Sequence, residues 1–104
     1  MIDKVMNEMK DVAEHLWKCD EGAYRQLAEC MDEWQRLLQE MVNKMCQWIN
    51  EGKEIPLDIV LCQIENFEVA LSRKDNLMLA DVLNFEFGET LKYYKGLLET
   101  YDGK

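Results

Sequence analysis

The residues best suited to catalysis in this sequence are few, and a histidine is the first of them. His15 is the only histidine, and Asp11 precedes it by one helical turn, so the two side chains can pair along a helix. Nucleophilic catalysis also needs a nucleophile that is activated by a correctly oriented base. Because the sequence offers no such nucleophile, we expect a surface pair and assign no catalytic residue.

Two pairs of glutamates have the spacing of magnesium ligands on helices. They are Glu65 with Glu68, and Glu86 with Glu89. The all-α nucleoside triphosphate pyrophosphatases carry E-x-x-E on one helix and E-x-x-D on another. On a helical wheel, however, Glu89 lies about 140° from the apolar centre of its helix. Basic residues to receive a triphosphate are also missing near these acids. We expect solvated glutamates, and a metal-dependent nucleotide hydrolase is kept as an alternative.

The four cysteines show no metal-binding spacing. They contain no C-x-x-C pair, and none lies close to the histidine in the sequence, so no zinc site is expected. No cofactor is expected either, because a Gly-rich phosphate loop is absent from the sequence. Cys46 and Cys62 flank an expected hairpin turn, where they could approach each other or be two small core residues.

Length and charge narrow the class of protein. The 104 residues, 48% of them hydrophobic, suit one helical domain over residues 1–104 that needs neither disulfides nor metals. The net charge of -9 repels phosphate backbones, so nucleic acid is not an expected partner. The sequence has neither the apolar region of a signal peptide nor the roughly 18 apolar residues of a membrane span. We expect a cytoplasmic protein with reduced cysteines and no membrane insertion.

Apolar residues recur with the period of an α-helix in four segments. We expect helices over about Ile2–Lys18, Ala23–Asn50, Pro56–Arg73 and Asn76–Tyr101. Short loops between long helices favour antiparallel neighbours, and hence an all-α, up-down four-helix bundle made of two helical hairpins. The alternative is a pair of hairpins that exchange or pack between two chains.

Turn residues support these boundaries. Asp20 and Asp75 are N-cap candidates, and Gly52 suits the left-handed position that follows a helix. On the wheel, Trp17 falls with the core residues of its helix. The second helix has an apolar arc wider than contact with one neighbour requires, which predicts two neighbours. The Met and Trp residues fall at core spacing, so we assign them to the core and not to a cofactor site or a promiscuous groove.

Two segments support a resemblance to known proteins. KDNLMLADVLNFE (Lys74–Glu86) and EGAYRQLAECMDEW (Glu21–Trp34) resemble a family of small all-helical bacterial proteins. Its members carry K-D-x-x-x-L-A-D-x-L-x-x-E in a late helix. The resemblance implies an all-helical fold and transfers no catalytic role, because no activity is established for that family. It places Asp81 and Glu86 at acidic positions of the motif.

The fourth expected helix is apolar on two faces. One face fits the bundle, and a second patch consists of Met78, Val82 and Phe85 at i, i+4 and i+7. Asp81 lies on one side of this patch and Glu86 on the other. An apolar patch with an acidic rim is typical of a partner-binding surface. The alternative is that this half of the helix is wedged between two helices of its own bundle.

These patterns favour interaction over catalysis. We expect a non-enzymatic helical protein-interaction module, homodimeric through its fourth helix. The first alternative is a chaperone-like adaptor that binds an amphipathic helix of a client protein. The hydrolase described above is the second alternative.

Overall fold

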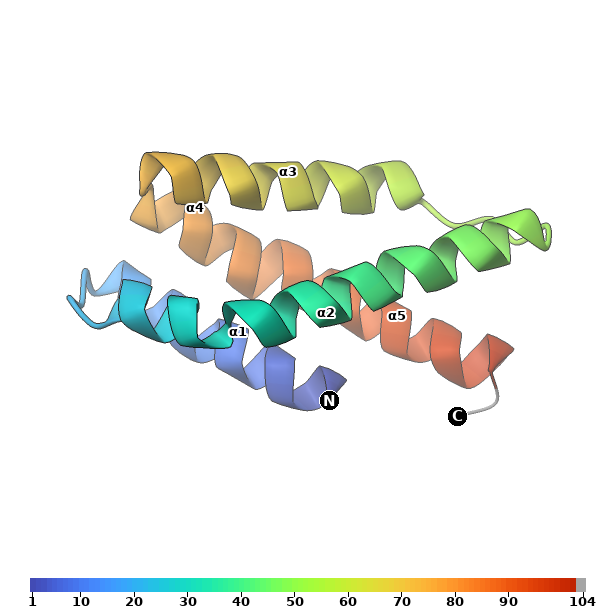
Figure 1. Cartoon of the computed structure of the whole chain (residues 1–104), viewed down its shortest axis with the longest axis horizontal. Helices are drawn as coiled ribbons and strands as arrows, with labels where there is room; N and C mark the ends of the chain where they lie inside the picture. Colours follow the sequence, from blue (N-terminus) through green and yellow to red (C-terminus); the bar gives the residue numbers. More distant parts are fainter. Residues whose placement is uncertain (103–104) are drawn as a thin grey trace.

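The fold is helical throughout the part of the chain that the structure, a computed structural model, describes, which is residues 1–102 (Figure 1). No strand occurs in these residues, so the all-α prediction is confirmed. The last three elements follow one another without a break and form a single long helix. In chain order the elements are α1 (Ile2–Trp17), α2 (Ala23–Asn50), α3 (Leu57–Arg73), α4 (Asn76–Asp81), the π-helix η1 (Val82–Glu86) and α5 (Phe87–Tyr101).

Consecutive helices run in opposite directions in Figure 1. The first hairpin is α1 with α2, and the second is α3 with the long helix made of α4, η1 and α5. α1 packs against α2 and along all three parts of the long helix, whereas α3 packs against α4 and η1. α2 and α3 approach each other at their connecting loop and diverge away from it. This divergence leaves one side of the molecule less tightly closed than the others.

The end of α2 shows why a glycine is needed there. The N–H of Gly52 donates to the carbonyl oxygen of Ile49 at 3.0 Å, and the N–H of Lys53 donates to that of Trp48 at 2.9 Å. This pair of hydrogen bonds requires a left-handed residue after the helix, and Gly52 has a φ of 94°. The role predicted for Gly52 is therefore confirmed.

Two other helices end in the same way without a glycine. Cys19 follows α1 with a φ of 53°, and Lys74 follows α3 with a φ of 51°. In each case the next N–H closes onto the carbonyl oxygen five residues earlier. A side chain in the left-handed region costs roughly 1–2 kcal/mol, so both turns carry local strain.

Two aspartates precede helices, and one of them is an N-cap. The side chain of Asp75 accepts a hydrogen bond from the N–H of Met78 at 3.1 Å, so its predicted N-cap role is confirmed. Asp20 accepts from the N–H of Gly22 at 2.9 Å in the turn before α2, and α2 itself begins one residue later at Ala23. The predicted boundary of α2 is correct, although Asp20 stabilises the preceding turn and is not the N-cap.

Candidate functional site

The predicted contact residues of the long helix lie in three different environments. Val82 is 1% exposed. For this residue the second alternative from the sequence, burial within its own bundle, is therefore correct. Met78 is half-buried against the core, whereas Phe85 is 55% exposed. Asp81 is exposed, and Glu86 is half-buried and accepts a hydrogen bond from an asparagine of α3 at 3.4 Å. The patch is therefore smaller and less continuous than the helical wheel indicates.

A π-helical turn explains the burial of Val82. The N–H of Phe87 donates to the carbonyl oxygen of Val82, five residues earlier, whereas an α-helix would use the residue four earlier. A wheel drawn at 100° per residue assumes a regular α-helix and rotates Val82 away from the core face. The wider turn lets Val82 and Phe87 both reach the core, where each is 1% exposed.

The exposed remainder of this patch is an aromatic pair. The rings of Phe85 and Trp17 lie 6.2 Å apart between centroids, at an interplanar angle of 48°. The sequence places Trp17 in the core, and this is wrong, because its side chain is 44% exposed. As the last residue of α1, Trp17 packs against η1 at the edge of the bundle. Leu77 is a further exposed apolar residue on the long helix.

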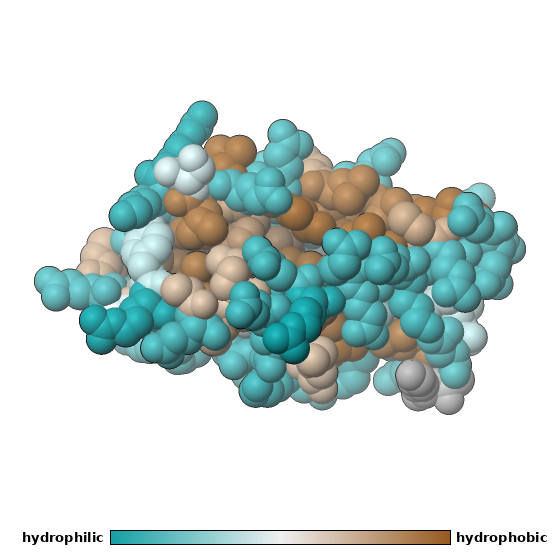
Figure 2. All heavy atoms as spheres, in the orientation of Figure 1, coloured by the Kyte–Doolittle hydropathy of each residue, from teal (hydrophilic) through white to brown (hydrophobic). Residues whose placement is uncertain are grey.

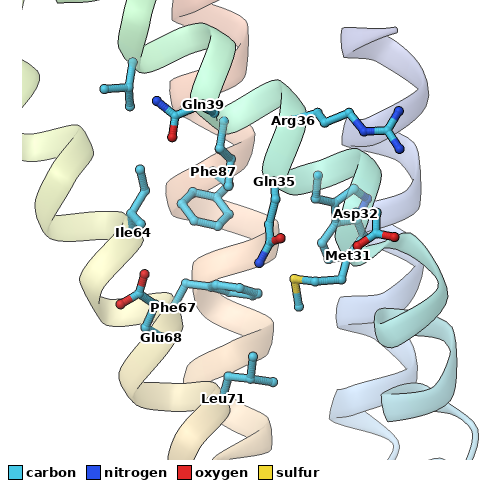
Figure 3. Close-up of a pocket in the computed structure, with 13 residues that line it drawn as sticks. Met31, Asp32, Gln35, Arg36, Gln39, Ile64, Phe67, Glu68, Leu71 and Phe87 are labelled. Carbon is cyan, nitrogen blue, oxygen red and sulfur yellow. The ribbon is translucent and has the colours of Figure 1, made fainter.

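A larger apolar surface lies where α2 and α3 diverge. There the two helices form the walls of a groove of about 690 Å³, and Phe87 of α5 contributes to its floor (Figure 3). Figure 2 shows apolar residues gathered along this side of the molecule, with polar residues on either side. The groove is lined by Met31, Asp32, Trp34, Gln35, Arg36, Leu38, Gln39 and Val42 of α2, by Ile64, Phe67, Glu68 and Leu71 of α3, and by Phe87.

The floor of the groove is aromatic. The rings of Phe67 and Phe87 lie 5.6 Å apart between centroids, at an angle of 47°. Trp34 lies beneath the α2 wall and is almost completely buried. Its indole N–H donates to the carboxylate of Glu8 on α1 at 3.3 Å, which satisfies the polar atom of this buried ring. This hydrogen bond connects the buried ring behind the α2 wall to α1.

Polar residues form the rim of the groove. Asp32, Gln35, Arg36 and Gln39 of α2 are exposed, as is Glu68 of α3. In Figure 3 the side chain of Gln35 reaches over the groove toward Phe67, whereas Arg36 points away from α3. A half-exposed apolar trough with a polar rim has the form of a surface that receives an apolar face of a partner.

The predicted pair of Asp11 and His15 connects two helices. His15 is half-buried, and its Nδ1 is 2.8 Å from Oε1 of Gln26 on α2. The amide of Gln26 donates in turn to Asp11 at 2.6 Å. The predicted pair of Asp11 and His15 is therefore bridged by Gln26, and this chain of hydrogen bonds fastens α1 to α2.

The glutamates of the alternative hydrolase do not converge on a common point. Glu86 accepts from α3, and Glu89 pairs with Lys92 on its own helix at 3.8 Å. Glu65 and Glu68 lie at the exposed surface of α3. Among residues 1–102 no group of three or more His, Cys, Asp or Glu side chains is placed to hold a metal ion.

The four cysteines are present as free thiols. Cys46 and Cys62 are both exposed and are not bonded to each other. Cys30 is partly buried beside Glu8, and burial, together with that carboxylate, raises the pKa of its thiol. A raised pKa disfavours the reactive thiolate.

The candidate site is interpreted from its geometry, because comparisons with known proteins found no match. No family model, curated protein or solved structure matches the chain. None of the helices within residues 1–102 combines the length and the apolar character that crossing a membrane requires. The resemblance noted in the sequence therefore stays an expectation about the fold.

Sequence reasoning missed the groove, although one signal pointed toward it. The apolar arc of α2 is wider than a single contact requires, and it includes Met31, Leu38 and Val42, which line the groove. The width predicts contact with two neighbours. α2 packs against α1 and also against α5, where Trp48 contacts Tyr94 and Tyr101. On the side that faces α3, its apolar residues border the groove.

Proposed function

We propose that the chain is a non-enzymatic protein-interaction module that holds a helix of a partner protein in the groove between α2 and α3. The observation that carries this proposal is an open apolar trough, about 690 Å³ in volume, above a packed aromatic floor. On this proposal the protein is an up-down bundle of two hairpins, and the divergence of α2 from α3 provides the binding surface. An adaptor that holds an amphipathic client helix has this form.

The groove walls can still gain stabilisation from a partner. Met31, Val42, Ile64 and Leu71 are only partly buried in the free chain. Complete burial of such a side chain contributes about 1.5–3 kcal/mol relative to full exposure, so a part of this remains available at each position. A helix that covers all four would gain several such increments, which supports reversible binding.

Self-association through the long helix is a second candidate, supported by the exposed pair of Trp17 and Phe85. Each aromatic side chain has roughly 150–250 Å² of surface, and only about half is exposed here. A stable dimer buries about 800 Å² per partner, so this pair would need a much larger surrounding contact. Two chains of net charge -9 also repel each other. We rank this candidate second.

The groove proposal can be tested with a neutral amphipathic peptide. Its design is a helix of about 18 residues, ~27 Å long, with Leu on one face and Gln elsewhere. We expect binding in the micromolar range, with amide NMR shifts concentrated in α2 and α3 along the groove. Ile64→Glu should abolish binding. Ile59→Glu, a change of the same kind on an exposed part of α3 outside the groove, should preserve it.

Two results would overturn the groove proposal. One is the absence of saturable binding, and the other is a set of NMR shifts located away from α2 and α3. For the second candidate, sedimentation over a wide concentration range should show a dimer that Phe85→Glu dissociates. A monomer at every concentration would remove that candidate.

A further inference from the structure

Each wall of the groove contains two apolar residues that are seven positions apart. On α2, Met31 and Leu38 are seven residues apart, and on α3 the same interval separates Ile64 from Leu71. Because the two helices run in opposite directions, Gln39, the residue after Leu38, lies nearer to Ile64 in Figure 3, and Met31 lies nearer to Leu71. Two helical turns rise about 10.5 Å, so the groove offers two apolar levels at this separation.

This repeat matches a helix better than a compact ligand. A helix that shows apolar residues at i, i+3 or i+4, and i+7 places side chains at both levels from one face. Seven-residue spacing is also the period at which helices pack along a shared seam. Phe67 and Phe87 close the bottom of the trough between the two levels, so the partner's apolar side chains meet a continuous floor.

The rim of the groove specifies the charge of the partner. Asp32 on α2 and Glu68 on α3 are exposed on opposite walls, and both line the groove. Among the described residues that line the groove, Arg36 is the one cation. In Figure 3 its guanidinium is directed away from α3, as is the carboxylate of Asp32 one turn earlier. Glu65 adds a further exposed carboxylate on α3. A helix lying in the groove would therefore have the carboxylates of Glu65 and Glu68 along its α3 side, with Asp32 on the outer side of α2.

We infer that the partner is a basic amphipathic helix, with apolar residues at seven-residue spacing and Lys or Arg on the flank of its apolar face that lies along α3. This inference rests on the proposed function, because it specifies the occupant of the same groove. The net charge of -9 favours approach of such a helix from a distance, and the rim carboxylates orient it once it is bound.

Three peptides with one apolar face test this inference. They share the Leu positions and carry Lys, Gln or Glu at the flanking positions. We expect the Lys peptide to bind about tenfold more tightly than the Gln peptide at low salt, and the Glu peptide to bind most weakly. The differences should shrink as the salt concentration rises toward about 1 M, because salt screens exposed charges.

A pair of matched variants separates rim recognition from attraction to the whole acidic molecule. The double variant Glu65→Gln with Glu68→Gln removes the two exposed carboxylates on the α3 side of the groove. The double variant Glu21→Gln with Glu99→Gln removes two exposed carboxylates that do not line the groove. We expect the preference for the Lys peptide over the Gln peptide to fall in the rim variant and to persist in the control.

Each alternative outcome has a distinct meaning. If the Gln peptide binds in the groove but the Lys peptide is no tighter, the inferred partner charge is wrong and the proposed function stands. An equal loss of preference in both double variants would also overturn the inference, because the charge effect would then be general. If none of the three peptides binds, the proposed function itself fails.

Discussion

The N–H of Phe87 donates a hydrogen bond to the carbonyl oxygen of Val82, five residues earlier in the chain. This π-helical bond joins two residues that both lie in the core. Phe87 is also part of the groove floor, so the bond determines how one element of the candidate site is presented. The π-turn accommodates one residue more than an α-helical turn would.

Removing one residue from this turn should be tolerated. Deletion of Asn84 would convert the bond from i–5 to i–4 and leave the core faces before and after the turn in place. We expect a cooperatively folded, helical protein with a melting temperature within about 5–10 °C of the parent, which corresponds to roughly 1 kcal/mol. Circular dichroism and thermal melting would measure this.

A deletion in a regular helix is the matched control. Deleting the exposed Glu40 in the middle of α2 rotates all following residues by about 100° and moves their apolar face away from the core. This variant should unfold or lose cooperativity. If both deletions were equally damaging, the π-turn would not be the point where an extra residue is absorbed.

Glycine at the strained ends of α1 and α3 should stabilise the protein. Lys74→Gly and Cys19→Gly each remove a side chain from the left-handed region, where it costs roughly 1–2 kcal/mol. The greater flexibility of glycine in the unfolded chain offsets part of the gain, so we expect about 0.5–1 kcal/mol per site in urea unfolding. Gly52→Ala, the reverse change at the end of α2, should destabilise by a similar amount. Lower stability of both glycine variants would contradict the assignment of strain.

The hydroxyl of Tyr94 should be dispensable for folding at neutral pH. Tyr94 is fully buried, and its hydroxyl has no hydrogen-bond partner among the described residues. A buried polar group without a partner costs about 1–3 kcal/mol. Tyr94→Phe keeps the ring that packs against Trp48 and removes the hydroxyl, so urea unfolding at pH 7 should show equal or greater stability. A loss above about 1 kcal/mol would show that the hydroxyl is satisfied in solution.

Tyr94 should also make the fold sensitive to alkali. Burial, with smaller contributions from Glu40 and Asp102, raises the pKa of Tyr94 to about 12 from its ordinary value of 10.0. Below pH 10 both the folded and the unfolded chain keep the proton, and the stability is unaffected. Between pH 10 and 12 the unfolded chain ionises first, so stability should fall by about 2–3 kcal/mol. Tyr94→Phe should lose less stability than the parent over this range, as measured by urea unfolding at each pH.

Glu8 should stabilise the buried Trp34, which lies behind the α2 wall of the groove. Its carboxylate accepts the indole N–H of the buried Trp34. Glu8→Ala leaves that donor unsatisfied and should destabilise the protein by about 1–3 kcal/mol. Glu8→Gln retains an acceptor oxygen and should recover most of the loss. If the two variants were equally stable, the hydrogen bond would contribute little.

Local structure was determined by the sequence to a large extent. The period of apolar residues located the helices, and α2 begins and ends at the predicted residues. Asp75 and Gly52 were recognisable because capping and left-handed turns depend on the chemistry of single residues. These features need only neighbours within one or two turns of the chain.

Tertiary structure decided the candidate site. Apolar periodicity shows which side of a helix avoids water, but it does not give the distance between two helices. Met31 and Ile64 thus read as ordinary core residues, and only the divergence of α2 from α3 leaves them beside a groove. The helical wheel placed Val82 on the wrong face for a related reason. The π-turn changes the angle per residue, and this turn packs against both α1 and α3. Distances between helices depend on how side chains from all four segments fit together, and no single segment of sequence contains that information.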